Sequence, residues 1–174
     1  MSSADSHVLP NFNARSPQHL IAYGFGAGLS PWAPGTMGTL LAVPLYALLS
    51  VLPTALYVII VAALIVAAIW ACGAACRELG GVDSPAIVGD EIVGFLVAMA
   101  AAPSGLIWII TAFLLFRLLD ITKPWPISVF HHRLRGGAGI VLDDVVAGLM
   151  TWVVIQGLHE MVVASLRGGH GVVH

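Results

Sequence analysis

The sequence predicts an all-α fold: a polytopic transmembrane bundle of about five helices that span a bilayer fully or in part, with polar motif loops converging on one face. Composition is the first reason. Of 174 residues, 59% are hydrophobic and 9% are charged, and the mean hydropathy is +0.95, whereas soluble domains carry about 25% charged residues. The spacing of charges is the second reason, because no Asp, Glu, Lys or Arg lies between Arg15 and Arg77 or between Glu91 and Arg117. Both gaps can hold a bilayer-crossing helix of about 20 residues.

The apolar segments follow one another in a clear order. Residues 54–76 form the clearest span, with 23 residues and no charge. Residues 38–52 are a shorter apolar run that Pro44 interrupts, and Leu-Pro-Thr at 52–54 predicts a turn between the two helices. The last apolar segment covers residues 140–166 and predicts a final helix that crosses or re-enters the membrane.

Residues 92–116 allow two interpretations, because 25 apolar residues can cross once or can form a hairpin of two short helices that turns at 102–105. Basic residues decide between them, since Lys and Arg favour the cytoplasmic side. A hairpin puts the basic residues after the run on the same side as Arg77. Six of the seven basic residues then lie on the cytoplasmic side, with Arg167 as the exception. We therefore predict a hairpin, followed by Arg117, Lys123, Arg133 and Arg135.

The domain organisation is simple. We predict a polar N-terminal tail at residues 1–19, one membrane-embedded domain at 20–166 and a C-terminal tail at 167–174. The first 19 residues lack the apolar core and small-residue cleavage site of a secretory signal. Cys72 and Cys76 lie one helical turn apart in an apolar segment, which favours helix packing over a disulfide or a metal site. The net charge of −2 predicts no nucleic-acid partner.

Acidic residues are concentrated in one part of the chain, since seven of the nine carboxylates fall in residues 78–144. Two acidic pairs lie about one turn inside apolar helices, in the frames IVGDEIVGFL and IVLDDVVAGL, which agree at five positions. Chance explains much of such a match between segments rich in Val, Ile and Leu. Small residues follow each pair, where helices can approach closely. The pairs are Asp90–Glu91 and Asp143–Asp144, followed by Gly94 and by Ala147 and Gly148.

Such acids are expensive at a lipid boundary, costing about 2.5–3.5 kcal/mol each at mid-helix, so a cluster of them indicates a function. Their repulsion is offset by protonation or by a divalent cation, and clustered carboxylate oxygens suit Mg²⁺. The alternative is that the acids mark helix N-termini and pair with basic residues of the same face. Two acidic pairs and Asp120 on one face favour the metal site over this alternative.

Other motifs offer groups that bind an anion. The Gly-rich stretch at 136–139 precedes the helix bearing Asp143, and N–H groups at a helix N-terminus cradle phosphate; a flexible turn is the alternative. Thr36 offers a hydroxyl within SPWAPGTMGT, where the alternative is a helix N-cap. Lys123 either binds phosphate or, with Trp125, anchors the chain at the membrane interface. Together these motifs predict chemistry on a phospholipid headgroup.

Two other function classes are compatible with acids in a membrane protein. A cation-coupled transporter carries intramembrane acids, but near the midplane on broken helices, whereas these cluster at one end. A phosphotransferase that joins a CDP-activated lipid to an alcohol shares the acids and Mg²⁺, but its long Asp/Gly/Arg signature is missing. No P-loop is present either.

Four ordered motifs, SPWAPGTMGT, IVGDEIVG, FRLLDITKPWPI and GGAGIVLDDVVAG, resemble the phosphatidylglycerophosphatase A family of bacterial inner-membrane enzymes. The resemblance covers about residues 20–155. It implies a Mg²⁺-dependent lipid phosphatase that removes the terminal phosphate of phosphatidylglycerophosphate to give phosphatidylglycerol in phospholipid biosynthesis. It also implies a protein of the bacterial inner membrane, and the placement of the basic residues predicts a multi-pass topology with the polar motif loops and the site on the cytoplasmic face. One departure is Gly89, where the family has a bulky aromatic residue before the acidic pair.

The residues and the resemblance together give a hypothesis for the site. Asp90, Glu91, Asp143 and Asp144 hold one or two Mg²⁺ ions, and Asp120 is the general base or a further ligand. The nucleophile is either a water on the metal or one of the aspartates. The substrate phosphate is bound by Thr36, Lys123, Gly136, Gly137 and Gly139. His131, His132 and Arg135 receive no role, because HHRLRGG is a variable stretch by the same resemblance.

Overall fold

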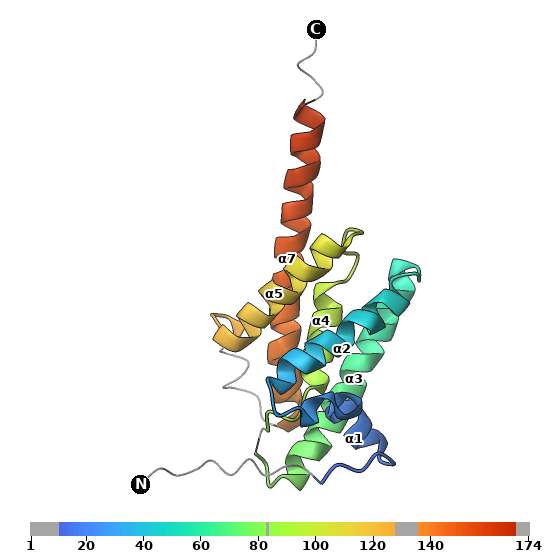
Figure 1. The fold of residues 1–174 in the computed structure, drawn as a ribbon, viewed down its shortest axis with the longest axis vertical. Helices are drawn as coiled ribbons and strands as arrows, with labels where there is room; N and C mark the ends of the chain where they lie inside the picture. Colours follow the sequence, from blue (N-terminus) through green and yellow to red (C-terminus); the bar gives the residue numbers. More distant parts are fainter. Residues whose placement is uncertain (1–10, 83, 128–135, 170–174) are drawn as a thin grey trace.

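The computed structural model describes residues 11–82, 84–127 and 136–169, and every element in these ranges is a helix (Figure 1). The predicted all-α class is therefore confirmed. In chain order the elements are α1 (Pro17–Ala22), the 3₁₀ helix η1 (Gly24–Leu29), α2 (Pro34–Leu49), α3 (Thr54–Glu78), α4 (Gly89–Ala98), α5 (Leu106–Thr122) and α7 (Gly136–Gly169).

The apolar run at 92–116 forms a hairpin, as the sequence predicts. Helix α4 ends at Ala98, and α5 begins after Gly105, whose φ of 125° is a backbone conformation that favours glycine. Side chains of α7 close this turn: Trp152 Nε1 donates to the Ala100 carbonyl at 2.7 Å, and Gln156 Nε2 donates to the Ala101 carbonyl at 3.1 Å. These bonds matter because carbonyls outside a helix have no intrahelical partner.

The first helical pair also follows the prediction in outline. Pro53 precedes the first residue of α3, so the chain turns at the predicted Leu-Pro-Thr sequence. Helix α2 begins at Pro34, four residues before the predicted start, because proline at the first helical position has its φ already set. Pro44 lies inside α2 without ending it.

Helix α4 is the centre of the bundle. It contacts α2, α3, α5 and α7 (Figure 1), and seven of its ten residues are buried. It crosses α7 closely at Gly94 and Gly148, where a Cβ atom on Gly148 would lie 2.3 Å from the Gly94 carbonyl oxygen. The small residues after each acidic pair therefore have the predicted packing role. Phe95 and Phe116 fill the core beside this crossing.

Two of the described helices, α3 and α7, are long and apolar enough to cross a membrane, and α2 is a shorter apolar helix. Helix α4 has 10 residues and is about 15 Å long, which is half the thickness of a hydrocarbon core of about 30 Å. The predicted bundle of spanning and partly spanning helices thus has two candidate full spans among the described residues. Figure 1 shows the C-terminal half of α7 extending beyond the other helices.

The boundary predicted for the N-terminal tail, residue 19, falls inside a helix. Helix α1 begins at Pro17, with the Ser16 side chain accepting from the His19 N–H. His19 is buried, its Nε2 lies 2.6 Å from Glu78 Oε2 at the end of α3, and the Phe12 ring packs on Tyr23. The end of the predicted tail is therefore part of the fold. The sequence did not indicate this packing, because residues 1–19 are mostly polar.

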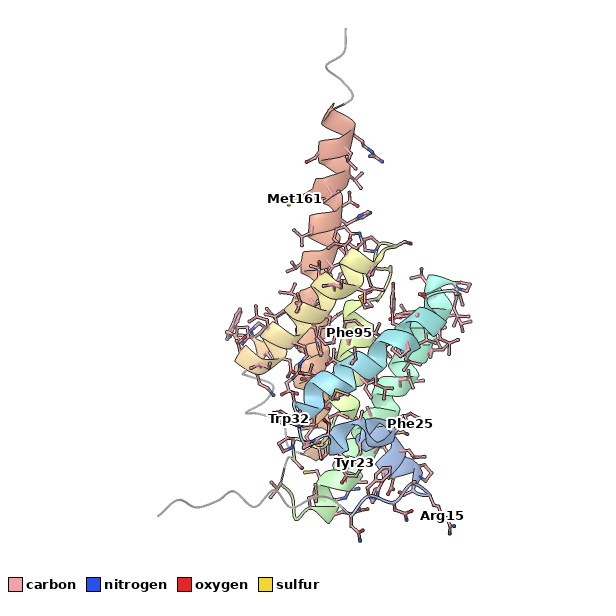
Figure 2. All side chains as sticks on the ribbon, in the orientation of Figure 1. Arg15, Tyr23, Phe25, Trp32, Phe95 and Met161 are labelled. Carbon is pink, nitrogen blue, oxygen red and sulfur yellow. The ribbon has the colours of Figure 1, made fainter. Side chains whose placement is uncertain are left out.

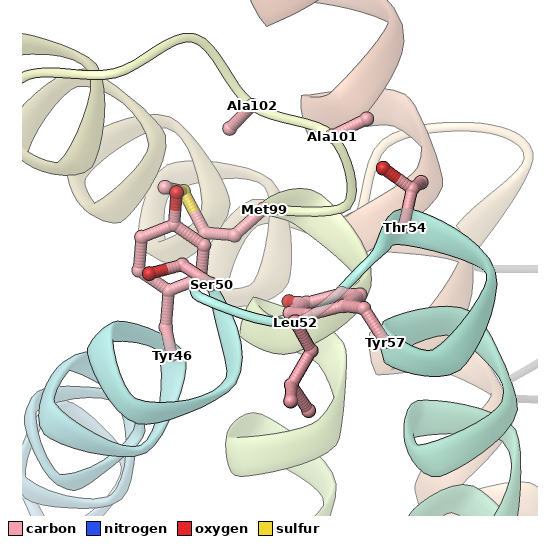
Figure 3. Close-up of a pocket in the computed structure, with 8 residues that line it drawn as sticks. All are labelled: Tyr46, Ser50, Leu52, Thr54, Tyr57, Met99, Ala101 and Ala102. Atoms are coloured by element: carbon pink, nitrogen blue, oxygen red, sulfur yellow. The ribbon is translucent and has the colours of Figure 1, made fainter.

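Two further features concern α3 and the end of the bundle far from the acids. Cys72 and Cys76 are buried in helix packing and form no disulfide with each other, as predicted. A cavity of about 280 Å³ opens where α2 and α4 end and α3 begins (Figure 3). It is lined by Tyr46, Ser50, Leu52, Thr54, Tyr57, Met99, Ala101 and Ala102, and by none of the predicted site residues.

Candidate active site

Three carboxylates from two helices meet beside the crossing of α4 and α7. Asp90 and Glu91 occupy the first turn of α4, and Asp144 projects from α7. One oxygen of each lies within 4.8 Å of the others. The Gly94 crossing sets this spacing, because a Cβ atom there would lie 2.8 Å from the Asp144 carbonyl oxygen. We call Asp90, Glu91 and Asp144 the three-carboxylate group.

The three-carboxylate group contains buried oxygens that the described part of the chain does not satisfy. Glu91 Oε2 and Asp144 Oδ2 are buried, and no hydrogen-bond partner for either is found within the described ranges. Burying an ionised carboxylate without a partner is unfavourable by several kcal/mol. Hard divalent cations bind such oxygens, so the residues present fit a Mg²⁺ ion.

Asp143 has a different partner from its neighbour Asp144. Its Oδ2 accepts a hydrogen bond from Lys123 Nζ, and its Oδ1 accepts one from the Asp144 N–H at 3.1 Å. Adjacent side chains of a helix point about 100° apart, and in α7 the two acids meet different groups, whereas the adjacent Asp90 and Glu91 of α4 meet in one. The sequence hypothesis placed all four acids on metal, whereas the structure groups three of them and joins Asp143 to a lysine.

Lys123 ends α5 in the left-handed conformation, with φ at 41°. For a residue with a Cβ atom this backbone conformation costs about 1–3 kcal/mol of strain, and such conformations are concentrated at functional sites. Burial lowers the pKa of the Lys123 amine, but the hydrogen bond to Asp143 and the charges of Asp143, Asp144 and Asp120 outweigh it and raise that pKa. The amine is therefore held as a cation beside the acids.

Helix α5 adds a second cation and a fifth acid. Arg117 Nη1 donates to Asp120 Oδ2 at 2.5 Å and lies 3.7 Å from Glu91 Oε1 on α4. The alternative interpretation of the acids as ion-pair partners is therefore correct for Asp120, for Asp143 and for one oxygen of Glu91. It does not account for the buried atoms Glu91 Oε2 and Asp144 Oδ2, for which the described residues supply no partner. Among the described residues the cluster has seven charged groups, with a formal excess of three negative charges: Asp90, Glu91, Asp120, Asp143 and Asp144 against Arg117 and Lys123.

The start of α2 closes the cluster on another side. A Cβ atom on Gly35 would lie 2.2 Å from Glu91 Oε1 and 3.0 Å from the Arg117 guanidinium, so only glycine fits here without a shift. Thr36 follows it and is half-buried. Its predicted contact with substrate stays a prediction.

The Gly-rich stretch lies at the start of α7. Gly136 is exposed with φ at 69°, Gly139 is buried, and Gly137 packs on α3, where its Cβ would lie 2.0 Å from the Ile69 carbonyl oxygen. Gly137 thus has a packing role that the sequence did not suggest. Asp143 follows Gly136 by two turns, about 10 Å along the axis, so one phosphate cannot touch both. Phosphate binding at this stretch stays a prediction.

Some residues of the sequence hypothesis cannot be placed, and others were missed. His131, His132, Arg133 and Arg135 lie outside the described residues. Arg117 was counted only as a possible partner of the acids, although its spacing of three from Asp120 predicts contact on one helix face. Gly35 gave no signal, because its importance comes from the approach of α2 to α4.

Gly89 also lies in a tight place. A Cβ atom there would lie 2.9 Å from both Cys72 Sγ and the Ile21 carbonyl oxygen. The chain therefore packs α1 and α3 directly against the start of α4. A bulky aromatic residue at this position requires these elements to lie farther apart.

Known proteins resemble this chain over most of its length. Residues 20–159 match the family model of phosphatidylglycerophosphatase A. The phosphatidylglycerophosphatase A of Escherichia coli K12 is 42% identical over 137 residues, which are 78% of this chain and 80% of that protein. That of Haemophilus influenzae is 39% identical over 153 residues, 87% of this chain and 94% of that protein. A relative from Bacteroides thetaiotaomicron, provisionally named a phosphatidylinositol-3-phosphatase, is 40% identical over 144 residues, 78% of this chain and 89% of that protein.

No solved structure matches the chain. The matched residues 20–159 contain all five carboxylates of the cluster together with Arg117 and Lys123. The chain therefore belongs to the phosphatidylglycerophosphatase A family.

Proposed function

We propose that this chain hydrolyses the terminal phosphate ester of phosphatidylglycerophosphate, giving phosphatidylglycerol and phosphate, in a Mg²⁺-dependent reaction of phospholipid biosynthesis. Its family makes it an enzyme, a phosphatidylglycerophosphatase, which is a phosphomonoesterase. The observation that carries the metal dependence is the three-carboxylate group, with two buried oxygens for which the described residues supply no hydrogen bond.

Asp90, Glu91 and Asp144 would hold the cation. When bound, Mg²⁺ supplies positive charge to the phosphate oxygens as the ester bond breaks. Asp143 remains a proposed further ligand, and it also fixes Lys123. A divalent cation lowers the negative charge of the cluster, which otherwise repels a dianionic substrate.

Lys123 is the proposed binding group for the phosphate. Its cationic amine reaches the cluster from the end of α5, with 31% of the side chain exposed. A lysine binds phosphate as a point charge with three donors. When a phosphate arrives, one of these donors can bind a phosphate oxygen while another keeps Asp143 in place.

Hydrolysis requires a new P–O bond from water and cleavage of the P–O bond to the glycerol headgroup. The leaving oxygen takes up a proton, and the attacking water loses one. Asp120 is the proposed proton acceptor, in a position that Arg117 fixes at 2.5 Å. The alternative is a direct attack by an aspartate, followed by hydrolysis of the phosphoenzyme. Covalent labelling of the protein by the phosphate of the substrate would identify this alternative.

The proposed location is the bacterial inner membrane, with one multi-pass domain at residues 20–166 and the site on the cytoplasmic side. Two candidate membrane helices support membrane association. Arg77 at the end of α3 and Lys123 beside the acids are basic residues at that end of the bundle, and basic residues favour the cytoplasmic side. Trp32 and Trp125 are exposed by 83% and 79%, as expected of aromatic residues at a membrane interface, and Figure 2 shows Trp32 at the surface.

Phosphate release from phosphatidylglycerophosphate in detergent micelles tests this function. We expect release with Mg²⁺, loss of release in EDTA, and recovery when Mg²⁺ is added back. Phosphatidylinositol 3-phosphate is the comparison substrate, because one relative is provisionally named for it. Release that persists in EDTA would exclude the metal mechanism. Faster turnover of phosphatidylinositol 3-phosphate would identify the inositol lipid, and not phosphatidylglycerophosphate, as the preferred substrate.

A further inference from the structure

Arg117 connects three helices around this cluster. It belongs to α5, its Nη1 atom binds Asp120 on its own helix, and the same atom faces Glu91 on α4. Both terminal nitrogens of its guanidinium would lie 3.0 Å from a Cβ atom on Gly35 in α2. The side chain is 14% exposed. One guanidinium therefore contacts three helices where they surround the acids.

The two oxygens of Glu91 have different surroundings. Oε1 faces the Arg117 guanidinium at 3.7 Å and lies against Gly35. Oε2 is buried and receives no hydrogen bond from any described residue, and Glu91 offers one oxygen to the three-carboxylate group. The guanidinium beside one oxygen orients the plane of the carboxylate, because turning that oxygen away from the cation would lose a favourable contact.

We propose that Arg117 is a positioning residue of the phosphatase: it holds Glu91 by Oε1, so that Oε2 stays available to a divalent cation, and it ties Asp120 to the same cluster. Gly35 is part of this arrangement, because a side chain there would push Oε1 away from the guanidinium. The inference rests on the proposed metal site. Arg117 itself acts through Glu91 and Asp120 and receives no role in binding substrate.

A lysine does not replace this arginine. One nitrogen, Nη1, faces acids on two helices, and the rest of the planar guanidinium lies against Gly35 of α2. An ammonium on a flexible stem is a compact point charge that is not held by such a planar contact. Arg117→Lys keeps the charge and loses the planar group, and Arg117→Gln loses both. Removing a residue that pairs with a metal-ligating side chain typically weakens metal affinity by about 10- to 100-fold.

Binding of Mn²⁺ to the purified full-length protein in detergent tests the inference, with the free ion measured by electron paramagnetic resonance. We expect Arg117→Gln to bind Mn²⁺ roughly 10- to 100-fold more weakly than the wild type, with Arg117→Lys between them. Arg77→Gln is the matched control, because Arg77 is exposed on α3, and it should bind as the wild type does. The Mg²⁺ concentration for half-maximal phosphate release should rise in the same order.

Gly35→Ala provides a second test that keeps Arg117 in place. Its new methyl group meets Glu91 Oε1, so Mn²⁺ binding should weaken, whereas Gly157→Ala on α7 meets nothing within 4 Å and should not change it. A thermal unfolding curve identifies the folded variants. If Arg117→Gln does not fold, Arg117→Lys and Gly35→Ala decide the question.

The outcomes separate this inference from the function on which it rests. Wild-type affinity for Mn²⁺ in folded Arg117→Gln, or in both of the other variants if that one is unfolded, would overturn the positioning role alone. If the wild type itself binds no Mn²⁺, the proposed metal site fails and the role of Arg117 fails with it. Weaker binding in the Arg117 and Gly35 variants, with both controls unchanged, supports the inference.

Discussion

At the scale of single residues, the position of Lys123 bears on its two interpretations, a phosphate-binding group and an anchor at the membrane interface. It is the only lysine of the chain, and its amine is hydrogen-bonded to Asp143 in the acidic cluster. A surface lysine used for solubility or as a membrane anchor does not need a buried aspartate as partner. Its place in the cluster favours the phosphate-binding interpretation over the interfacial anchor.

Lys123→Gln should therefore impair catalysis more than folding. A hydrogen bond to a charged group is worth about 1.5–3 kcal/mol, which corresponds to about a 10- to 100-fold loss in kcat/KM. Lys123→Arg keeps the charge and should retain more activity. The measurement is the rate of phosphate release against substrate concentration, with thermal unfolding as the control for folding. Wild-type kcat/KM in Lys123→Gln would remove this residue from the site.

The acids show what sequence reasoning can and cannot resolve at this scale. Their types, their spacing and the lack of other charges predicted a metal-ready cluster, and five of them lie together with Arg117 and Lys123. The sequence could not predict that Asp143 pairs with Lys123 while Asp144 joins the three-carboxylate group, because this difference depends on the rotation of α7 about its axis. That rotation is set by packing against α4 at Gly148.

At the scale of helices, the α4–α7 crossing determines the geometry of the site. Gly148→Ala would place a methyl group 2.3 Å from the Gly94 carbonyl oxygen, and backbone cannot move aside as a flexible side chain can. Overpacking of this kind costs about 1–3 kcal/mol, so we expect a lower Tm and reduced activity. Gly157→Ala lies on the same helix in open space and should leave Tm unchanged or slightly raise it. Equal Tm values for the two variants would show that the crossing tolerates a larger separation.

The helices themselves were largely predictable, and their close approaches were not. Charge placement chose the hairpin in residues 92–116, and Pro53 and Gly105 mark the turns that the structure contains. The contacts of Gly35 and Gly137 come from chain segments far apart in sequence, so composition and spacing could not reveal them. The same reason explains why residues 11–19 were predicted as a tail although they pack on α3.

At the scale of the whole molecule, the length of α7 can be compared with the thickness of a membrane. The helix continues for 23 residues from Asp144 to Arg167, which is about 35 Å at 1.5 Å per residue. This length matches a hydrocarbon core of about 30 Å. If the acids lie at the level of the cytoplasmic headgroups, the end of α7 reaches the opposite surface.

Labelling of single cysteines tests this placement. In a variant without the native cysteines, Ser84→Cys should react with a membrane-impermeant maleimide only from the cytoplasmic side, because Ser84 precedes the helix that carries Asp90 and Glu91. Ser165→Cys, near the end of α7, should react only from the outside. Reaction of both positions from one side would exclude α7 as a full span.

The central claim is that carboxylates from α4 and α7 form one metal-dependent phosphatase site. The most direct measurement is the Mg²⁺ dependence of phosphate release from phosphatidylglycerophosphate for the wild type, Asp90→Asn, Asp144→Asn and the control Glu78→Gln, whose glutamate pairs with His19 away from the cluster. We predict Mg²⁺-dependent release by the wild type and the control, and none by the two folded aspartate variants. Release by either aspartate variant at the wild-type rate, or release without a divalent cation, would contradict the account.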